Sequence, residues 1–475
     1  MNYEESVRAL LSLGKELAAP RQPARFASAA LTAISSVAIP VQKFGLENIS
    51  ILAEDLGQPH RAMPCAHIAG TNGKGSTAAM LESIMRTAGI RTGLYTSPHL
   101  ERINERIRIE GKDMSDQDFA AAWTCVRSSI ESLMASGRLA AHPTFFECVT
   151  AMAFLAFASH RVEFAIFEVG MGGRFDATNI VNPGVAIITP IDYDHENYLG
   201  HSIEEIAAEK AGIIKANAKV VSAAQRPEAT AVIARRSAEM NARLVQVVES
   251  WNIEDMKVSG GFYSAAATFA QSPPKLSIAP ALPGRFQVQN ALAAATAARL
   301  LAEGGYSIGD EAIERGIATA RWPGRLERIS QRPDVYLDGA HNPAGARELL
   351  SFWEENFAGR RIFLVYGAMR DKAVDEIASL LFSRAEAVIF TMPRQSRAIS
   401  ARLLSEVTGH FAKRSFVVPD PAEAVDRAVE LADPGDVVFV AGSLYLVGDI
   451  HAIWRKCETK KPSIQEPTVK PPASR

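Results

Sequence analysis

The chain has 475 residues, of which 47% are hydrophobic and 22% are charged, and its formal net charge is −2. These values are typical of a globular protein, and the length favours two domains. A near-neutral charge argues against a surface that attracts nucleic acid. The N-terminus has acidic side chains and no unbroken apolar core, and the chain has no run of about 18 uncharged apolar residues. We therefore expect a cytoplasmic protein with no signal peptide, no membrane span and no nucleic-acid partner.

Short apolar runs rich in β-branched residues alternate with alanine-rich segments along the chain. This alternation predicts parallel sheets that helices cover on both faces. We predict buried strands at 65–69, 164–169, 185–190, 220–223, 335–338, 362–366, 387–391, 416–418 and 437–440. We predict helices at 77–88, 203–214, 290–303 and 422–432.

Three segments interrupt the alternation. Residues 249–281 carry short polar–apolar alternations that end in Ser272-Pro273-Pro274, which favours a small antiparallel excursion. Trp322-Pro323-Gly324 predicts a domain boundary, because proline and glycine stop a helix. The last residues are rich in lysine and proline and predict a disordered tail. We therefore predict domains at 1–320 and 321–458 and a tail at 459–475.

A glycine-rich segment, GTNGKGST at 70–77, joins a predicted strand to a predicted helix. Glycines let backbone N–H groups crowd around phosphate oxygens, and a helix N-terminus favours negative charge. Lys74 supplies a charge for the terminal phosphates, and the hydroxyl of Ser76 or Thr77 can reach magnesium. Gly75 stands between the lysine and the serine, so the segment departs from the strict G-x-x-x-x-G-K-[ST] pattern. Its context favours a variant nucleotide-binding loop over a glycine turn that begins an ordinary helix.

These features predict an α/β fold class. The N-terminal part is expected to be a P-loop-containing, doubly wound parallel-sheet ATPase domain. A smaller, Rossmann-like α/β C-terminal domain is expected to follow it.

Two predicted strands end in candidate ligands for a divalent metal. Glu168 ends the strand at 164–169, and Asp194-His195 follows the strand at 185–190. The carboxyl ends of the strands of a doubly wound sheet face the crevice where ligands bind. Oxygen ligands beside substrate phosphates suit magnesium better than zinc. For His195 alone, a helix cap is an equally good interpretation.

Two other polar residues have ordinary interpretations when they are considered singly. Lys210 lies on an amphipathic helix, where a lysine is usually a solvated surface charge. Ser97 is a loop serine.

The sequence resembles the folylpolyglutamate synthase/dihydrofolate synthase family, relatives of the muramyl ligases of cell-wall synthesis. The matching stretches occur in family order and span nearly the whole chain apart from the tail. They are HIAGTNGKGST (67–77), YTSPHLERINERIRI (95–109), TFFE (144–147), EVGMGGRFDATNI (168–180), DHENYLG (194–200), EKAGIIK (209–215), WPGRLE (322–327), DGAHNPAG (338–345) and, more loosely, GSLYLVGD (442–449). The succession of EVGMGGR and DATNI separates this family from the muramyl ligases.

The resemblance implies roles for individual residues. The ATP phosphates would be bound by Thr71, Asn72, Gly73, Lys74, Gly75 and Ser76, and the rest of the nucleotide by Asn290, Arg325 and Asp338. Two magnesium ions would be held by Ser97, Glu168, His195 and Lys210, the lysine as an N6-carboxylated (carbamylated) side chain. The catalytic residues would be Lys74, Lys210 and His341. The pterin contacts would be Gln42, Lys43, Phe44, Thr144, Phe145, Phe146, Glu147, Phe175, Asp176 and Ala177. We expect glutamate to bind on the second domain near His341 and Ser443.

Two positions require a choice or depart from the family pattern. Two P-G-R triplets compete for the arginine role, at Arg285 and Arg325, and the second lies in the matched stretch that leads to Asp338. Phe286 stands where the family often has histidine. Because phenylalanine has no conventional hydrogen-bonding group, we expect no polar nucleotide contact from this position.

The resemblance implies an ATP-dependent ligase that works through an acyl phosphate. It would add L-glutamate to dihydropteroate, forming dihydrofolate, and to the γ-carboxylate of reduced folates. TFFE and FDATN favour dihydropteroate binding, so we expect both reactions, carried out by a monomer.

Two alternatives to a folate ligase are possible. A muramyl-type ligase would add an amino acid to a UDP-sugar peptide. The phosphate loop already at residue 70 argues against it, because no N-terminal UDP-binding domain precedes the loop. A P-loop switch protein would use ATP only to change shape, which would give no role to the DGAHNPAG segment of the second domain.

Overall fold

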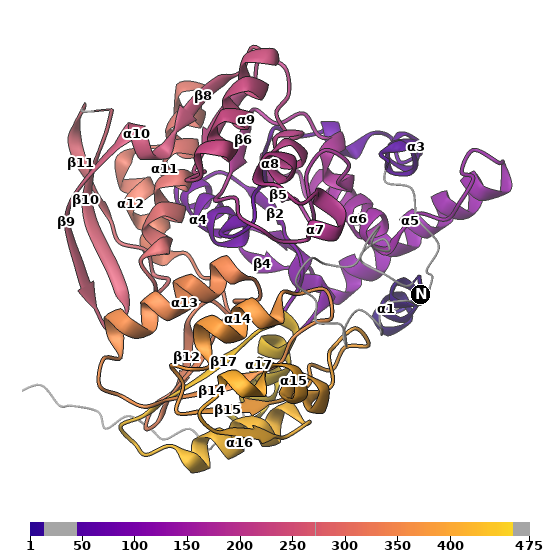
Figure 1. Cartoon of the computed structure of the whole chain (residues 1–475). Coiled ribbons are helices and arrows are strands. Elements are labelled where there is room, and N and C mark those ends of the chain that lie inside the picture. Colours follow the sequence, from indigo (N-terminus) through magenta and orange to yellow (C-terminus); the bar gives the residue numbers. More distant parts are fainter. Residues whose placement is uncertain (14–44, 271, 459–475) are drawn as a thin grey trace, which may run out of the picture.

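The structure is a computed structural model that describes residues 1–13, 45–270 and 272–458 (Figure 1). The predicted pterin contacts Gln42, Lys43 and Phe44 lie outside the described residues, as does the predicted tail at 459–475.

The first sheet has eight strands in the order β4-β3-β2-β5-β1-β6-β7-β8. From β2 to β8, neighbouring strands run parallel, while β3 and β4 form an antiparallel edge. The strands are β1 (Cys65–Ala69), β2 (Thr92–Tyr95), β3 (Ile107–Ile109), β4 (Lys112–Asp113), β5 (Phe164–Glu168), β6 (Val185–Ile188), β7 (Lys219–Ser222) and β8 (Arg243–Gln246).

Helices cover both faces of this sheet, because successive side chains of a strand point to opposite sides. Ala66 and Ile68 of β1 pack on one face with α4 (Lys74–Thr87), α11 (Phe286–Glu303) and α12 (Asp310–Thr319). The other face packs against α5 (Asp116–Ala135), α6 (Phe145–Ser159), α8 (Ile203–Ala211) and α9 (Pro227–Glu239). Also in this part are α1 (Tyr3–Ser12), α3 (Glu47–Asp55), α7 (Glu196–Leu199), α10 (Val247–Ser250), η1 (Pro59–Arg61), η2 (Ile103–Arg106) and η3 (Ala177–Ile180).

A three-stranded antiparallel sheet lies beside α11, as the polar–apolar alternation of 249–281 predicts. It consists of β9 (Trp251–Ser259), β10 (Phe262–Phe269) and β11 (Ser272–Ile278). Trp251 is buried against the helix and donates from Nε1 to Thr296 Oγ1 at 2.8 Å. The same sheet contacts the C-terminal part of the chain, since Tyr263 hydrogen-bonds Glu355 and its hydroxyl accepts from Asn356 Nδ2 at 3.3 Å.

The second sheet has six strands in the order β12-β13-β17-β14-β15-β16. Its strands are β12 (Glu327–Ser330), β13 (Asp334–Leu337), β14 (Ile362–Tyr366), β15 (Ala387–Phe390), β16 (Ser415–Val417) and β17 (Val437–Ala441). The helices are α13 (Pro343–Asn356), α14 (Val374–Leu381), α15 (Ala401–Thr408), α16 (Pro421–Leu431) and α17 (Leu444–Glu458), with η4 at Gly409–Phe411. Only β12 runs antiparallel to its neighbour. Apolar cores on both faces make this a second α/β unit.

The predicted α/β class is confirmed, and the predicted buried strands pair in parallel. Each sheet also has antiparallel strands at one edge, which the sequence does not predict: β3 and β4 in the first sheet and β12 in the second. These edge strands are short and half exposed, so they lack the continuous apolar run that identifies a buried strand. Within the described ranges, every helix is too short or too polar to cross a bilayer.

The C-terminal unit lies against the first sheet on the side where α13 and α14 are found (Figure 1). Polar residues of both parts meet there, next to the loop that follows β1. The carboxyl ends of β1, β5 and β6 are in the same region, as the doubly wound topology requires.

Candidate active site

The glycine-rich loop is held closely by its neighbours. It leaves β1 at Gly70, whose φ of 149° and contact with Thr189 leave no space for a Cβ atom. Gly73 begins α4 in the left-handed region with φ at 87°, and a Cβ there would collide with Asn290. Both positions therefore require glycine, and the first N–H groups of α4 have no partner within the helix. The strand, the glycine turn and the helix start that the sequence predicts for this segment are therefore present.

Two lysines, the half-buried Lys74 and the buried Lys210, converge on a single backbone carbonyl of this loop. Lys74 donates from Nζ to Gly70 O at 3.1 Å and to Thr71 O at 3.0 Å. Lys210 donates from Nζ to Gly70 O at 2.8 Å. Burial lowers the pKa of both amines and, together with the charge of Lys74, brings the pKa of Lys210 to about 7.

The interpretation of Lys210 as a solvated helix lysine is therefore wrong. Only 4% of the residue is exposed. Lys210 is buried because α8 packs directly on the glycine-rich segment after β5. Gly173 of that segment lies so close to the backbone of Glu209 and Lys210 that there is no space for a Cβ atom. The inner face of α8 thus carries its lysine into the site.

Two predicted metal ligands meet at the ends of neighbouring strands. Glu168 is the last residue of β5 and is buried, and its Oε2 accepts the N–H of Ser97 at 3.2 Å. Burial raises the pKa of Glu168, while the charges of Lys74 and Arg325 oppose this rise. The carboxylate therefore faces the cations of the phosphate loop.

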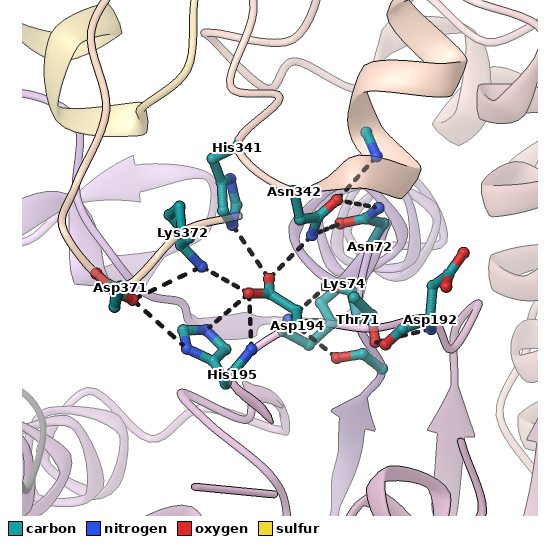
Figure 2. A network of polar contacts seen from close by, with 12 residues as sticks. Thr71, Asn72, Lys74, Asp192, Asp194, His195, His341, Asn342, Asp371 and Lys372 are labelled. Atoms are coloured by element: carbon teal, nitrogen blue, oxygen red, sulfur yellow. Dashed lines mark hydrogen bonds and ion pairs between the residues drawn. The ribbon is translucent and has the colours of Figure 1, made fainter. Parts of the chain in front are cut away.

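Asp194 is the centre of a polar network that joins the two parts of the chain (Figure 2). Lys372 Nζ lies 2.7 Å from Asp194 Oδ1, Asn342 Nδ2 donates to Oδ2 at 2.9 Å, and His341 Nε2 lies 3.4 Å from Oδ2. Burial alone would raise the pKa of Asp194, but the charge of Lys372 and the hydrogen bond with His341 hold the pKa well below its usual value. Three residues of the C-terminal part thus bind one carboxylate of the N-terminal part.

His195 lies beside this carboxylate, at the start of α7 and with φ at 53°. Its Nε2 is 3.9 Å from Asp194 Oδ1, and its Nδ1 is 3.9 Å from Asp371 Oδ2. Burial lowers its pKa to about 4, so the ring is neutral near pH 7. Buried Nδ1 has no hydrogen-bond partner among the described residues, which suits a nitrogen that binds a metal. Across those residues, however, no three His, Cys, Asp or Glu side chains form a ready-made metal cluster.

A reciprocal pair of amides links the phosphate loop to α13. Asn72 Nδ2 donates to Asn342 Oδ1 at 3.1 Å, and Asn342 Nδ2 donates to Asn72 Oδ1 at 3.0 Å (Figure 2). Asn342 also caps α13, because its Oδ1 accepts the N–H of Gly345 at 2.8 Å. The side chain is buried and all its hydrogen-bonding groups are used.

The predicted nucleotide residues Arg325 and Asp338 lie on the loop before β12 and at the end of β13. Asp338 accepts the N–H groups of Leu326 and Ala340, each at 2.9 Å. Burial raises its pKa and the Arg325 charge opposes the rise. Arg325 donates to Gly324 O at 3.1 Å.

The third predicted nucleotide residue, Asn290, is tied to the phosphate loop. Its Nδ2 donates to Gln287 Oε1 at 2.9 Å, and Gln287 Nε2 lies 3.4 Å from Ser76 Oγ. The departure at Phe286 has a structural explanation, because this side chain packs against the core of the C-terminal unit.

Among the candidate pterin residues of the TFFE stretch, some side chains stabilise α6 or the core, and one is partly exposed. Thr144 and Glu147 cap α6 reciprocally, since each side chain accepts the other's backbone N–H. Phe145 is a buried core residue, whereas Phe146 is half buried and lies against Gly170.

The second group of candidate pterin residues follows β5. Asp176 is buried and accepts the N–H groups of Gly170 and Met171 at 2.9 and 3.1 Å. Ala177 is buried, and Phe175 is 46% exposed. Phe146 and Phe175 are thus the aromatic candidates that present surface. On the C-terminal unit, Ser443 is buried before α17, where its Oγ accepts the N–H of Tyr445 at 3.2 Å.

Sequence reasoning missed Lys372 and the bridging role of Asn342. A strand-end signal could have identified the first of these, because Asp371-Lys372 follows the predicted strand at 362–366. Asn342 lay inside the matched stretch DGAHNPAG, but its partners come from distant segments.

Known proteins resemble the chain over most of its length. The model of the Mur ligase middle domain matches residues 68–298, and that of the Mur ligase glutamate ligase domain matches residues 324–444. The dihydrofolate synthase/folylpolyglutamate synthase of Bacillus subtilis is 38% identical over 86% of this chain and 94% of its own length.

Solved structures agree with these matches. The Mycobacterium tuberculosis folylpolyglutamate synthase, complexed with ADP and AMPPCP, superposes with a TM-score of 0.82 at 34% identity, over 86% of this chain and 95% of its own. The Escherichia coli FolC structure, in complex with DHPP and ADP, superposes with a TM-score of 0.78 at 31% identity, over 90% and 97%. The chain belongs to the dihydrofolate synthase/folylpolyglutamate synthase family of the Mur ligase superfamily, ATP-dependent enzymes that ligate glutamate to folates.

Proposed function

We propose that the chain catalyses both reactions of its family. It would add L-glutamate to dihydropteroate, and also to the γ-carboxylate of reduced folates. The convergence of Lys74 and Lys210 on Gly70 O is the observation that supports ATP-dependent ligation at this site. The Bacillus subtilis relative is named for both activities, and the Escherichia coli relative was solved with DHPP and ADP.

ATP would activate the substrate carboxylate, which is otherwise a poor electrophile. Transfer of the terminal phosphoryl group to a carboxylate oxygen forms an acyl phosphate and releases ADP. The loop N–H groups and Lys74 would spread the charge that moves in this step. The ADP and AMPPCP complexes of the Mycobacterium tuberculosis relative support the nucleotide assignment.

Magnesium would be held by Ser97, Glu168 and His195, whose oxygen and nitrogen donors fit the ion. The buried carboxylate at the end of β5 and the unbonded Nδ1 of His195 support this assignment. The ion would neutralise phosphate charge during transfer.

Lys210 would be carbamylated: its neutral amine would add to the carbon of dissolved CO2 and release one proton. A carbamate forms only on a neutral amine, and Lys210 is buried beside a second cation that shares its hydrogen-bond acceptor. A pKa of about 7 leaves a large neutral fraction at physiological pH. Carbamylation would replace a cation near Lys74 with an anion and so relieve the repulsion between the two lysines.

Glutamate would bind between the two parts of the chain, near His341, Lys372 and Ser443. Its amine would attack the acyl carbon, and inorganic phosphate would leave as the amide bond forms. We assign the proton that the amine loses to His341, because its Nε2 lies 3.4 Å from Asp194 Oδ2, where the two parts of the chain meet. The two parts would correspond to domains at 1–320 and 321–458, and their closure would exclude water from the acyl phosphate.

The test is glutamate-dependent ADP release from the full chain with each acceptor in turn. We expect release with dihydropteroate and with a reduced folate, and none when glutamate is omitted. Activity with only one acceptor would limit the chain to one reaction. Activity with a UDP-sugar peptide and with neither pteridine would refute the proposal and favour the muramyl-type alternative. ADP release that glutamate leaves unchanged would favour a switch protein.

A further inference from the structure

A charged cluster behind the site involves none of the residues assigned above. His451 of α17 lies between two carboxylates of separate segments. Its Nδ1 hydrogen-bonds Glu101, and its Nε2 lies 3.3 Å from Glu327 Oε1. Arg455, one turn further along α17, places Nη1 3.3 Å from Glu101 Oε1. The His451 side chain is 14% exposed.

Glu101 belongs to the segment that carries Ser97. Glu105 makes this segment rigid, because its carboxylate accepts the N–H groups of Leu100, Glu101 and Arg102 at 2.8, 3.0 and 2.7 Å. The same segment is packed under α17, where a Cβ atom on Gly448 would collide with the backbone of Leu100. The turn that begins at Leu100, three residues after Ser97, is therefore held both by Glu105 and by α17.

Glu327 belongs to the loop that carries Arg325. Its Oε2 accepts the N–H of Gly324 at 2.7 Å. Gly324 has a positive φ of 73° and lies against Leu100 and Val447, so this loop contacts both the Ser97 segment and α17. The second carboxylate therefore fixes the turn immediately before Arg325.

We propose that His451 is a positioning residue, which as an imidazolium fixes the Ser97 segment and the Arg325 loop relative to each other. Both ring nitrogens face carboxylates, and an imidazolium can donate to both while a neutral ring can donate to only one. The raised pKa of His451, about 9 because of its hydrogen bond to Glu327, agrees with this state. The inference rests on the proposed function, since Ser97 and Arg325 are there assigned to magnesium and nucleotide.

The test compares His451→Phe, which keeps an aromatic ring, with His451→Lys, which restores a cation. Arg455→Ala is the matched control, because Arg455 also contacts Glu101 but its side chain is 67% exposed, whereas that of His451 is 14% exposed. We expect His451→Phe to raise the KM for ATP and weaken ADP binding by about tenfold or more, since small displacements of binding groups have effects of this size. The KM for glutamate should change much less. His451→Lys should recover most of the loss, and Arg455→Ala should resemble the parent.

Two further measurements separate positioning from folding and from the proposed function. ADP binding by calorimetry needs no acceptor, so it tests the role of His451 even if folate turnover fails. Glu101→Gln and Glu327→Gln remove one charge each with little change of shape, and each should weaken ADP binding in the same direction. Unchanged ADP binding in folded His451→Phe protein would overturn the proposal. So would equal losses in the KM for ATP and the KM for glutamate.

Discussion

Replacing Asn342 with aspartate exchanges one nitrogen for one oxygen and reverses how this side chain interacts with Asp194. In the structure, Asn342 Nδ2 donates to Asp194 Oδ2 at 2.9 Å and to Asn72 Oδ1 at 3.0 Å. In the aspartate variant, two carboxylates would face each other at that separation. The helix cap on α13 would survive, because aspartate accepts the N–H of Gly345 as asparagine does.

The size of the effect follows from two competing costs. Two unit charges about 2.9 Å apart repel by roughly 6 kcal/mol at an effective dielectric constant of about 20. Protonating one aspartate of ordinary pKa near 4 costs about 4 kcal/mol at pH 7, at about 1.4 kcal/mol for each pH unit. Protonation costs less than the repulsion, so one of the two aspartates should take up a proton. The closed arrangement of the two parts should therefore lose up to about 4 kcal/mol, or about a thousandfold in population.

The sign of the pH dependence follows from this protonation. The repulsion exists only while both carboxylates are ionised, so the penalty shrinks as pH falls. The activity of Asn342→Asp relative to the parent should therefore rise by up to about tenfold for each pH unit between about 8 and 6.

The assay is ADP release with glutamate and acceptor, with kcat/KM measured across this range. Asn342→Ser is the control, because serine also caps α13 and loses the amide contacts without adding a charge. Its activity should fall less than that of Asn342→Asp, and its ratio to the parent should not change with pH. Equal activities of the aspartate and serine variants at pH about 8 would refute the electrostatic reasoning.

Three other predictions concern the loop and the lysine and histidine clusters. Lys210→Ala should lower kcat by about 100-fold while the protein stays folded, as loss of a metal-supporting group does; full activity would rule out the carbamate. Gly73→Ala should destabilise the fold by about 1–2 kcal/mol in urea unfolding and weaken ADP binding, because φ is 87° and the new Cβ would collide with Asn290. His451 has a folded pKa of about 9, above the unfolded value of 6.5, so its contribution to the free energy of unfolding is complete below pH about 6.5 and is lost as pH rises through 9. The difference in the free energy of unfolding between the parent and His451→Phe should therefore shrink as pH rises from about 6.5 to about 9.5. A difference that stays constant over this range would contradict the assignment.

Most of the fold was predictable because the buried strands are continuous apolar runs. The strand at 164–169 appears as Phe164–Glu168, and the strand at 362–366 as Ile362–Tyr366. The edge strands escaped prediction because their residues are polar and few, as Lys112–Asp113 illustrates. Pairing with a neighbour, rather than any local pattern, makes these residues strands.

The site was predictable where a motif and its topology coincide, and less so where distant segments meet. The phosphate loop needed only its glycines and the strand–helix context. Lys210 illustrates the limit, since its spacing indicates a surface residue and only the packing of Gly173 on α8 buries it. Asp194 and Lys372 are 178 positions apart, and no local signal reveals that they form an ion pair.

The antiparallel sheet beside α11 limits how the two parts of the chain can move. The chain crosses from one part to the other near Trp322-Pro323-Gly324, and Tyr263 on β10 makes a second attachment to Glu355 of α13. A movement that carries α13 away from the phosphate loop must therefore either break this second attachment or take the antiparallel sheet with it. The sheet thus restricts the separation of Asn342 from Asn72 to movements that keep Tyr263 and Glu355 together.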